Sequence, residues 1–424
     1  MRFSARTAWD LAETRLARAL RERRAAGLPI FDLTASNPTQ CGFAYDDAGI
    51  LAALTDREAL VYDPDPHGMR RAREAVCRYY AERGARVDAE QVFLTTSTSE
   101  AYSWLFRLLC DAGDEVLIAQ PSYPLFDFLA QIEDVRLRPY PLFYDHGWQI
   151  DLAGLRERIT LKTKAIALVH PNNPTGHFTR DAERRELESL CAEHGLALIV
   201  DEVFLDYAMP GQDGRSFAAG DSCAEGERWD RKAGERGDEI RRFATGKHLA
   251  LTFVLSGVSK IAALPQMKAA WIVAFGPAAA GPERELSEAL ARLEVVADTF
   301  LSMNAPVQCA LPAWLAGCGA MQEQIRARTR ENLRKLDQIL LRNSAVTRLE
   351  VEAGWYAVLR VPALGSDEDL AVRLVEERGV SVHPGYFFGF AGDGWLVVSL
   401  LTPEGEFRMG VEKICSLFGG AGSG

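Results

Sequence analysis

Residues 196–204 read LALIVDEVF and residues 251–260 read LTFVLSGVSK, and charged side chains stand at or near the end of both apolar runs. Short runs that are rich in Val, Ile, Leu and Phe are typical of strands buried on both faces, as in a parallel sheet. The carboxyl ends of parallel strands open onto the ligand crevice of such a sheet. The sequence therefore predicts that Asp201 and Lys260 lie at the crevice of an α/β protein.

The same pattern continues on both sides of these runs. Three further strand-like runs are each followed by a segment with helical periodicity: residues 91–96, 115–120 and 165–170. This alternation predicts a mixed, mostly parallel sheet with crossover helices. Two long helical segments, residues 282–297 and 308–342, and the strand-like residues 356–361 and 395–401 come later. They predict a smaller α+β C-terminal domain.

These changes of pattern divide the chain into five parts. Residues 1–45 are expected to form an N-terminal arm and part of the small domain, and residues 46–300 the large domain. Residues 301–417 are expected to form the small C-terminal domain, and residues 418–424 a disordered tail. Residues 211–246 are rich in Gly and charged side chains, which predicts a surface insertion, either functional or merely solvated.

Composition excludes several classes of protein. The 424 residues are 48% hydrophobic and 25% charged, as in a globular protein. The formal net charge of -11 argues against a nucleic-acid partner, which would require clustered Lys and Arg. No apolar run reaches the roughly 18 residues that span a membrane, and residues 1–24 fit an amphipathic helix better than a signal peptide. We therefore expect a cytoplasmic protein with no nucleic-acid or membrane partner.

The spacing of the cysteines and histidines does not indicate a metal site. The eight cysteines and seven histidines are dispersed along the chain and do not occur in the paired spacings of zinc ligands. Neither a metal nor a disulfide framework is expected.

Lys260 stands at the end of an apolar run, beside Gly257 and Ser259. Desolvation at the edge of a hydrophobic core lowers the pKa of a lysine and leaves a neutral amine that can attack a carbonyl group. A lysine at a strand end can equally extend its ammonium group into water. Lys260 alone does not decide between these two roles.

Asp201 and Asn173 follow two other predicted strands. A buried aspartate needs a cationic partner, which a protonated pyridine nitrogen would supply, although an acid after a strand is also a common helix cap. Asn173 belongs to the turn HPNNPTG, residues 170–176, where its amide could donate a hydrogen bond to the ring oxygen of a cofactor.

Ser97 and Thr98 come directly before a helical segment, where free N–H groups and the helix dipole suit a phosphate. They fit a simple helix N-cap equally well, with Glu100 in the first turn. Tyr123 follows the next strand and could stack on a flat ring. Since these groups and Lys260 end successive strands of one sheet, we expect them to meet in one crevice that suits pyridoxal 5'-phosphate (PLP).

Nearly the whole chain resembles the aminotransferase class I/II family, the fold type I PLP-dependent enzymes. The most specific motifs are NPTG, an Asp-Glu pair followed by an aromatic residue, and Ser-x-Lys, in that order along the chain. They stand here in HPNNPTG (residues 170–176), VDEVF (200–204) and SGVSK (256–260). Further matching stretches are DLTASNPT (32–39), YDPDPHGMRRAR (62–73), TTSTSEA (95–101), QPSYPLF (120–126), MKAAW (267–271), SMNAPVQCAL (302–311) and GVSVHPGYFFGF (379–390).

The resemblance implies a role for each matched residue around the ring of the cofactor. Lys260 would carry PLP and move the substrate proton, and Asp201 would pair with the pyridinium nitrogen. Asn173 would donate to the ring hydroxyl, and Tyr123 would stack on the ring.

The resemblance also implies how the phosphate is held. Ser97 and Thr98 would form the phosphate turn, and Tyr62 would reach the phosphate of the neighbouring subunit. This arrangement implies a homodimer with shared active sites.

Three residues depart from the pattern of the family. Lys268 stands where a phosphate-binding arginine is expected, so the charge is kept and the forked geometry is lost. Phe204 stands in place of a tyrosine beside the cofactor ring, so one phenolic hydrogen bond is absent. Val397 stands in place of the arginine that binds the substrate carboxylate.

The carboxylate must then be bound in another way, because an unpaired carboxylate is costly to bury. We expect Ser36 through its backbone, Asn173, and Arg360 from the adjacent strand to bind it. The other possibility is a substrate that presents no α-carboxylate at this point. In either case small or apolar amino acids are expected rather than aspartate or glutamate.

The expected activity is that of a PLP-dependent aminotransferase acting on an amino acid and a 2-keto acid. A PLP-dependent lyase, decarboxylase or cyclase on the same fold is the alternative, since the fold does not fix which bond at the α-carbon breaks. A third possibility is a ligand-sensing protein that keeps the cofactor without turnover. The retention of both Lys260 and Asp201 disfavours a structural relic.

Overall fold

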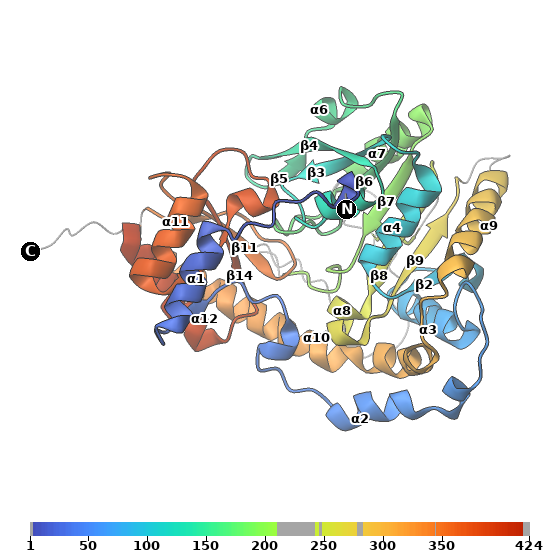
Figure 1. Ribbon diagram of the computed structural model, residues 1–424, viewed down its shortest axis with the longest axis horizontal. Coiled ribbons are helices and arrows are strands. Elements are labelled where there is room, and N and C mark those ends of the chain that lie inside the picture. Colours follow the sequence, from blue (N-terminus) through green and yellow to red (C-terminus); the bar gives the residue numbers. More distant parts are fainter. Residues whose placement is uncertain (1–2, 210–241, 246–247, 278–282, 344, 419–424) are drawn as a thin grey trace, which may run out of the picture.

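The structure is a computed structural model that describes residues 3–209, 242–245, 248–277, 283–343 and 345–418. Most of the expected insertion, residues 211–246, and the tail after residue 418 lie outside this described part. The described chain forms a larger domain, at the right in Figure 1, and a smaller one at the left.

An eight-stranded sheet forms the centre of the larger domain, in the order β2-β9-β8-β7-β6-β3-β4-β5. Its strands are β2 (Val92–Thr95), β3 (Glu115–Gln120), β4 (Arg136–Tyr144), β5 (Trp148–Ile150), β6 (Thr163–Val169), β7 (Ala197–Asp201), β8 (Thr252–Gly257) and β9 (Ala270–Phe275). The neighbours from β8 through β4 are parallel, whereas β9 and β5 are antiparallel to the strands beside them. The prediction of an α/β fold with a mixed, mostly parallel sheet is confirmed.

Strand direction fixes which ends of the strands share an edge of the sheet. Because β9 is antiparallel to both of its neighbours, β2 and β8, these two strands run in the same direction. The carboxyl ends of β2, β3, β6, β7 and β8 therefore lie along one edge.

Helices cover both faces of this sheet (Figure 1). Successive residues of a strand point to opposite faces, so Phe93 and Ile199 belong to one core and Leu94 and Val200 to another. The first core is closed by α4 (Thr98–Leu109), α5 (Phe126–Ile132) and α9 (Glu283–Phe300). The second is closed by α3 (Arg70–Ala81), α6 (Leu152–Arg156), α7 (Asp181–His194) and α10 (Ala305–Leu340). Burial on two faces explains why the strands are almost continuously apolar.

The smaller domain contains an antiparallel sheet in the order β10-β11-β14-β13. Its strands are β10 (Thr347–Arg348), β11 (Tyr356–Arg360), β13 (His383–Pro384) and β14 (Trp395–Ser399), and a separate parallel pair joins β1 (Phe31–Asp32) to β12 (Val380–Ser381). The helices α1 (Arg15–Ala25), α11 (Asp367–Arg373) and α12 (Glu404–Phe418) contribute side chains to its core or pack around it. The N-terminal segment thus returns to the C-terminal part of the chain through β1.

The remaining elements are short. They are α2 (Asp47–Ala52), α8 (Val258–Ile261), a π-helical turn (Leu374–Arg378) and the 3-10 helices Ala5–Thr7, Pro38–Gln40, Ala53–Thr55, Arg57–Leu60, Ala89–Gln91, Pro265–Met267 and Gly385–Phe388.

The N-terminal helix is shorter than predicted. Instead of one helix over residues 1–24, α1 begins only at Arg15, where the Thr14 side chain accepts from the Ala17 N–H as an N-cap. The preceding segment packs against α5, because the Trp9 ring contacts Phe128 edge-on at 5.6 Å between ring centroids. This tertiary contact replaces the helical turns that the sequence pattern indicated.

Helix α10 belongs to both domains. It contributes Trp314 and Ile325 to a core of the larger domain and Leu336 to the core of the smaller domain. Both long predicted helices are confirmed, with ends within three residues of those predicted. A single rigid helix of 36 residues thus connects the two cores.

A backbone contact at Gly176 also joins the domains. Gly176 has a φ of +72°, and a Cβ atom there would lie 2.4 Å from the carbonyl oxygen of Ala353, just before β11. Only glycine combines this left-handed conformation with so close an approach. The loop after β6 therefore has a fixed position against the beginning of β11.

We expect Gly176→Ala to destabilise the protein more than Gly195→Ala does. Gly195 has a similar φ of +64° and no atom within 4 Å of the added Cβ. Its substitution therefore costs only the free energy of holding alanine in the left-handed conformation, roughly 1–2 kcal/mol. The clash with Ala353 should add at least about 1 kcal/mol. Urea unfolding of both variants measures the difference, and equal losses would show that this loop can move away from β11 at no cost.

Candidate active site

Polar and charged side chains follow five strands at the shared edge of the large sheet. They are Ser97 after β2, Tyr123 after β3, Asn173 after β6, Asp201 at the end of β7 and Lys260 after β8. The topology brings together the residues that the sequence analysis placed in one crevice.

Lys260 lies in α8 with its amine beside two aromatic rings. Its Nζ is 4.8 Å from the ring centroid of Trp355 and 5.6 Å from that of Phe204. Burial lowers the pKa of Lys260 to about 8, although the nearby charge of Asp201 opposes the change. The phenol of Tyr207 donates a hydrogen bond of 2.5 Å to the backbone oxygen of Lys260 and fixes this turn. Lys260 therefore has a substantial neutral fraction close to neutral pH.

Asp201 is buried with few partners. Burial raises its pKa to about 7, against the opposing effects of the Val203 N–H and of Lys260. Within the described residues its carboxylate accepts one hydrogen bond, from Val203 N at 3.1 Å. A buried carboxylate with so little compensation is suited to a further cationic hydrogen-bond donor, such as the pyridinium N–H of PLP.

Several buried polar atoms near this edge lack hydrogen-bond partners among the described residues, and three of them are of interest here. They are Asn173 Oδ1 after β6, Ser122 Oγ after β3 and Ser256 Oγ in β8. Such atoms are rare in folded proteins. Their position beside Asp201 and Lys260 fits a polar ligand that would bond to them, and PLP has a ring hydroxyl and a phosphate for this purpose.

Ser97 is the N-cap of α4. Its Oγ accepts from Glu100 N at 3.1 Å, so the structural role that the sequence allowed is present. The first turn of a helix still has N–H groups without partners inside the helix, which suits a phosphate beside Ser97 and Thr98. The cap and the phosphate site are therefore compatible.

Tyr123 is near the carboxylate of Asp201. Burial raises the pKa of its phenol, and the charge of Asp201 adds to this effect. The ring is 37% exposed and contacts only Phe126 among the described rings, edge-on at 5.8 Å. One face of Tyr123 is therefore available for stacking on a flat ligand.

Three other predicted residues form no hydrogen bond, ion pair or ring contact with this group in the single described chain. Lys268 is exposed, next to Ala269, whose carbonyl oxygen accepts from Val258 N in the first turn of α8. Tyr62 is 82% exposed. Arg360 lies over the Trp395 ring at 4.4 Å and donates to the backbone oxygen of Asp393 at 2.6 Å.

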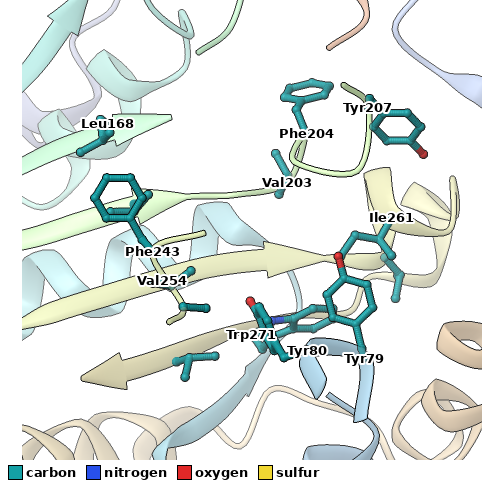
Figure 2. Close-up of a cluster of buried hydrophobic side chains, with 14 of the residues drawn as sticks. Tyr79, Tyr80, Leu168, Val203, Phe204, Tyr207, Phe243, Val254, Ile261 and Trp271 are labelled. Atoms are coloured by element: carbon teal, nitrogen blue, oxygen red, sulfur yellow. The ribbon is translucent and has the colours of Figure 1, made fainter. Parts of the chain in front are cut away.

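Two aromatic residues of the smaller domain were missed as site residues by the sequence analysis. The Trp355 ring packs edge-on against Phe204 at 5.3 Å, beside the loop after β7 on which Figure 2 shows Val203, Phe204 and Tyr207. Tyr356 is buried, and its side chain lies near that of Ser36. Two consecutive aromatic residues after Gly354 were the available signal, but they also fit an ordinary strand.

One other side-chain group has metal-like spacing within the described chain. The ligand atoms of Asp56, Glu58 and Cys309 lie within 4.8 Å of one another. The guanidinium group of Arg71 already pairs with both Asp56 and Glu58, so this group forms ion pairs. Separately, no described helix combines the length and apolar character needed to cross a membrane.

Comparison with known proteins identifies similar chains along nearly the full length. Residues 46–414 match the family described as aminotransferase class I and II. A glutamate-pyruvate aminotransferase of Haemophilus influenzae is 23% identical over 385 residues, covering 88% of this chain and 87% of the relative. An arginine–pyruvate transaminase of Pseudomonas aeruginosa is 27% identical over 414 residues, covering 96% and 93%.

Solved structures show the same fold. An alanine aminotransferase of Pyrococcus furiosus superposes with a TM-score of 0.81 at 21% identity, covering 98% of this chain and 99% of that one. A Thermus thermophilus aspartate aminotransferase mutant gives a TM-score of 0.79 at 23% identity, covering 98% and 100%.

We expect Asp201→Asn to stabilise the cofactor-free protein at pH 8. The folded-state pKa of Asp201 is raised, so the wild type loses stability as pH rises from about 4 through about 7 while the variant does not. The gain at pH 8 should be of the order of 1–3 kcal/mol and should vanish near pH 4. Thermal unfolding across this pH range measures it.

Asp206→Asn is the matched control for this measurement. Burial alone would raise the pKa of Asp206, but Arg83 and Arg242 outweigh it and lower the pKa. Asp206→Asn should therefore lose stability at pH 8, and a similar loss in Asp201→Asn would contradict our description of Asp201.

Proposed function

We propose that this chain, which belongs to the aminotransferase class I and II family, uses PLP to transfer an amino group between a small or apolar amino acid and a 2-keto acid. The resemblance found in the sequence is confirmed by the family match, and the chain is an aminotransferase. One observation of the structure carries the assignment of the site. A buried Asp201 and a Lys260 with a lowered pKa lie at one edge of the sheet.

Each residue of the site would have a defined task. When bound, PLP supplies an electron-poor ring that accepts the electron pair left at the substrate α-carbon. Asp201 would keep a proton on the ring nitrogen, and Asn173 would donate to the ring oxygen. The Nζ atom of Lys260 would carry the cofactor and later move the α-proton, for which a pKa of about 8 is well placed. Phe204 adds apolar contact and no hydrogen bond.

The phosphate would be bound from two sides. Ser97 and Thr98 would bind it at the first turn of α4, and Lys268 would contribute a point charge next to the first turn of α8. Lys268 forms no ion pair within the described residues, which supports a role toward a bound anion.

A homodimer in the cytoplasm is the assembly and location that we propose. Tyr62 would reach the phosphate of the other subunit, in accord with its exposure in the single chain. Its neighbours Leu60 and Val61 are 84% and 65% exposed, and three adjacent exposed apolar or aromatic side chains favour burial against a second copy.

The substrate preference follows from Val397. It is fully buried in β14, so the carboxylate end of the site has no arginine at this position. A dicarboxylic amino acid would need two cationic partners, whereas a monocarboxylic one needs a single partner. The relatives named above act with pyruvate, a small keto acid, although the amino acids in their names are glutamate and arginine; they favour transamination over the lyase, decarboxylase or cyclase alternative.

We expect the holoenzyme to be converted to its pyridoxamine form by L-alanine more efficiently than by L-aspartate, by at least about tenfold in kcat/KM. Stopped-flow absorbance with a panel of amino acids, followed by recovery with pyruvate, measures both half-reactions. Lys260→Ala should abolish the conversion. Release of ammonia or carbon dioxide without recovery by a keto acid would show a lyase or decarboxylase instead.

A further inference from the structure

The face of the small sheet that contains Val397 is defined by strand register. Val397 of β14 pairs with Val358 of β11 on one side and with His383 of β13 on the other. Directly paired side chains of antiparallel strands lie on the same face. Val397, Val358 and Tyr356 belong to the core shared with the larger domain, whereas the intervening Ala357 belongs to the small-domain core. His383 therefore lies on the face that looks toward the cofactor site.

His383 is the available source of positive charge on this face. Arg360 also lies on it, two residues beyond Val358 along β11 and opposite Trp395, which places its Cα about 7 Å from that of Val358. Its guanidinium group is engaged with Asp393 and Trp395. Among the described residues of this sheet, His383 is the titratable side chain directly beside Val397.

His383 is oriented by the N-terminal segment. Its imidazole lies near the backbone of Thr34 and near the carboxylate of Asp32. Burial lowers its pKa, and these two contacts oppose the change. The side chain is only partly buried and lies beside the rings of Tyr356 at 6.3 Å and Phe388 at 5.7 Å. It can therefore contact a ligand, while the N-terminal segment and the two rings restrict its movement.

Tyr356 connects His383 to the proposed cofactor site. Its hydroxyl lies near the Ser36 side chain, and it is close enough to Tyr123 for the two phenols to interact electrostatically. Tyr123 in turn lies near Asp201. A series of neighbouring residues thus connects Asp201 with the face of the small sheet where the arginine is absent. Along this series Asp201 is followed by Tyr123, Tyr356 and His383.

We propose that His383 and Tyr356 bind the carboxylate of the amino-acid substrate in place of the arginine that Val397 replaces. This inference rests on the proposed aminotransferase function and names the residues that select its substrate. The Tyr356 hydroxyl and an imidazole N–H donate to the two carboxylate oxygens. Binding an anion favours the imidazolium form, which gives one cation for one carboxylate. Val397, Val358 and Phe388 make the rest of this face apolar, so the site selects monocarboxylic substrates.

The test uses the holoenzyme and two probes, L-alanine for turnover and propionate for binding without turnover. His383→Gln should raise the KM for alanine and the Kd for propionate, measured by calorimetry, by roughly 10- to 100-fold, the range for a lost hydrogen bond to a charged group. Tyr356→Phe should raise both about 3- to 10-fold. The kcat of either variant and its affinity for PLP should change less than about threefold, because neither residue touches the ring.

A matched control and a rescue complete the experiment. His146→Gln removes a fully exposed histidine and should change neither constant. The double variant with His383→Gln and Val397→Arg should bind propionate at least tenfold more tightly than the His383→Gln variant does. Val397→Arg alone should bind propionate more tightly than the wild type does. Unchanged constants in His383→Gln and Tyr356→Phe, or a loss in Arg360→Gln instead, would overturn the inference. Propionate binding that depends on His383 in an enzyme that transaminates no amino acid would refute the proposed function alone.

Discussion

The site depends on two ionisable groups that the sheet buries at one edge. Asp201 and Lys260 follow the adjacent parallel strands β7 and β8, and burial shifts their pKa values toward each other, to about 7 and about 8. Neither charge is well compensated within the described chain. The burial of these two groups lowers the stability of the folded protein. Such destabilisation is typical of sites whose ionisable groups find their partners in a bound ligand. Ser97, Tyr123 and Asn173 are placed by the same edge, because each of them follows a strand that ends there.

The smaller domain completes the site through a shared core and through backbone contacts with the larger domain. The Ser122 N–H donates to the backbone oxygen of Phe388 at 2.9 Å, and Gly176 allows the loop after β6 to approach Ala353. These contacts place Trp355 and Tyr356 opposite Lys260 and Tyr123.

Residues whose position depends on local pattern were predictable from the sequence. The buried strands were visible as apolar runs, and strand-end residues such as Asp201 and Lys260 could be placed in one crevice by the rule for parallel sheets. Tyr356 and His383 could not be found in this way. Their common face depends on the register of β11, β13 and β14, which pairs residues that are distant in sequence. The same register pairs Arg360 with Trp395, at the end of β11 away from Tyr356.

The central claim is that Lys260 is the residue that carries the cofactor. Borohydride reduction of the holoenzyme, followed by proteolysis and mass spectrometry, tests it directly, because reduction fixes the pyridoxyl group to the lysine that binds it. We expect the added mass on the peptide that contains Lys260, and its loss in Lys260→Ala. A pyridoxyl group on Lys268, or on any other lysine, would contradict the account.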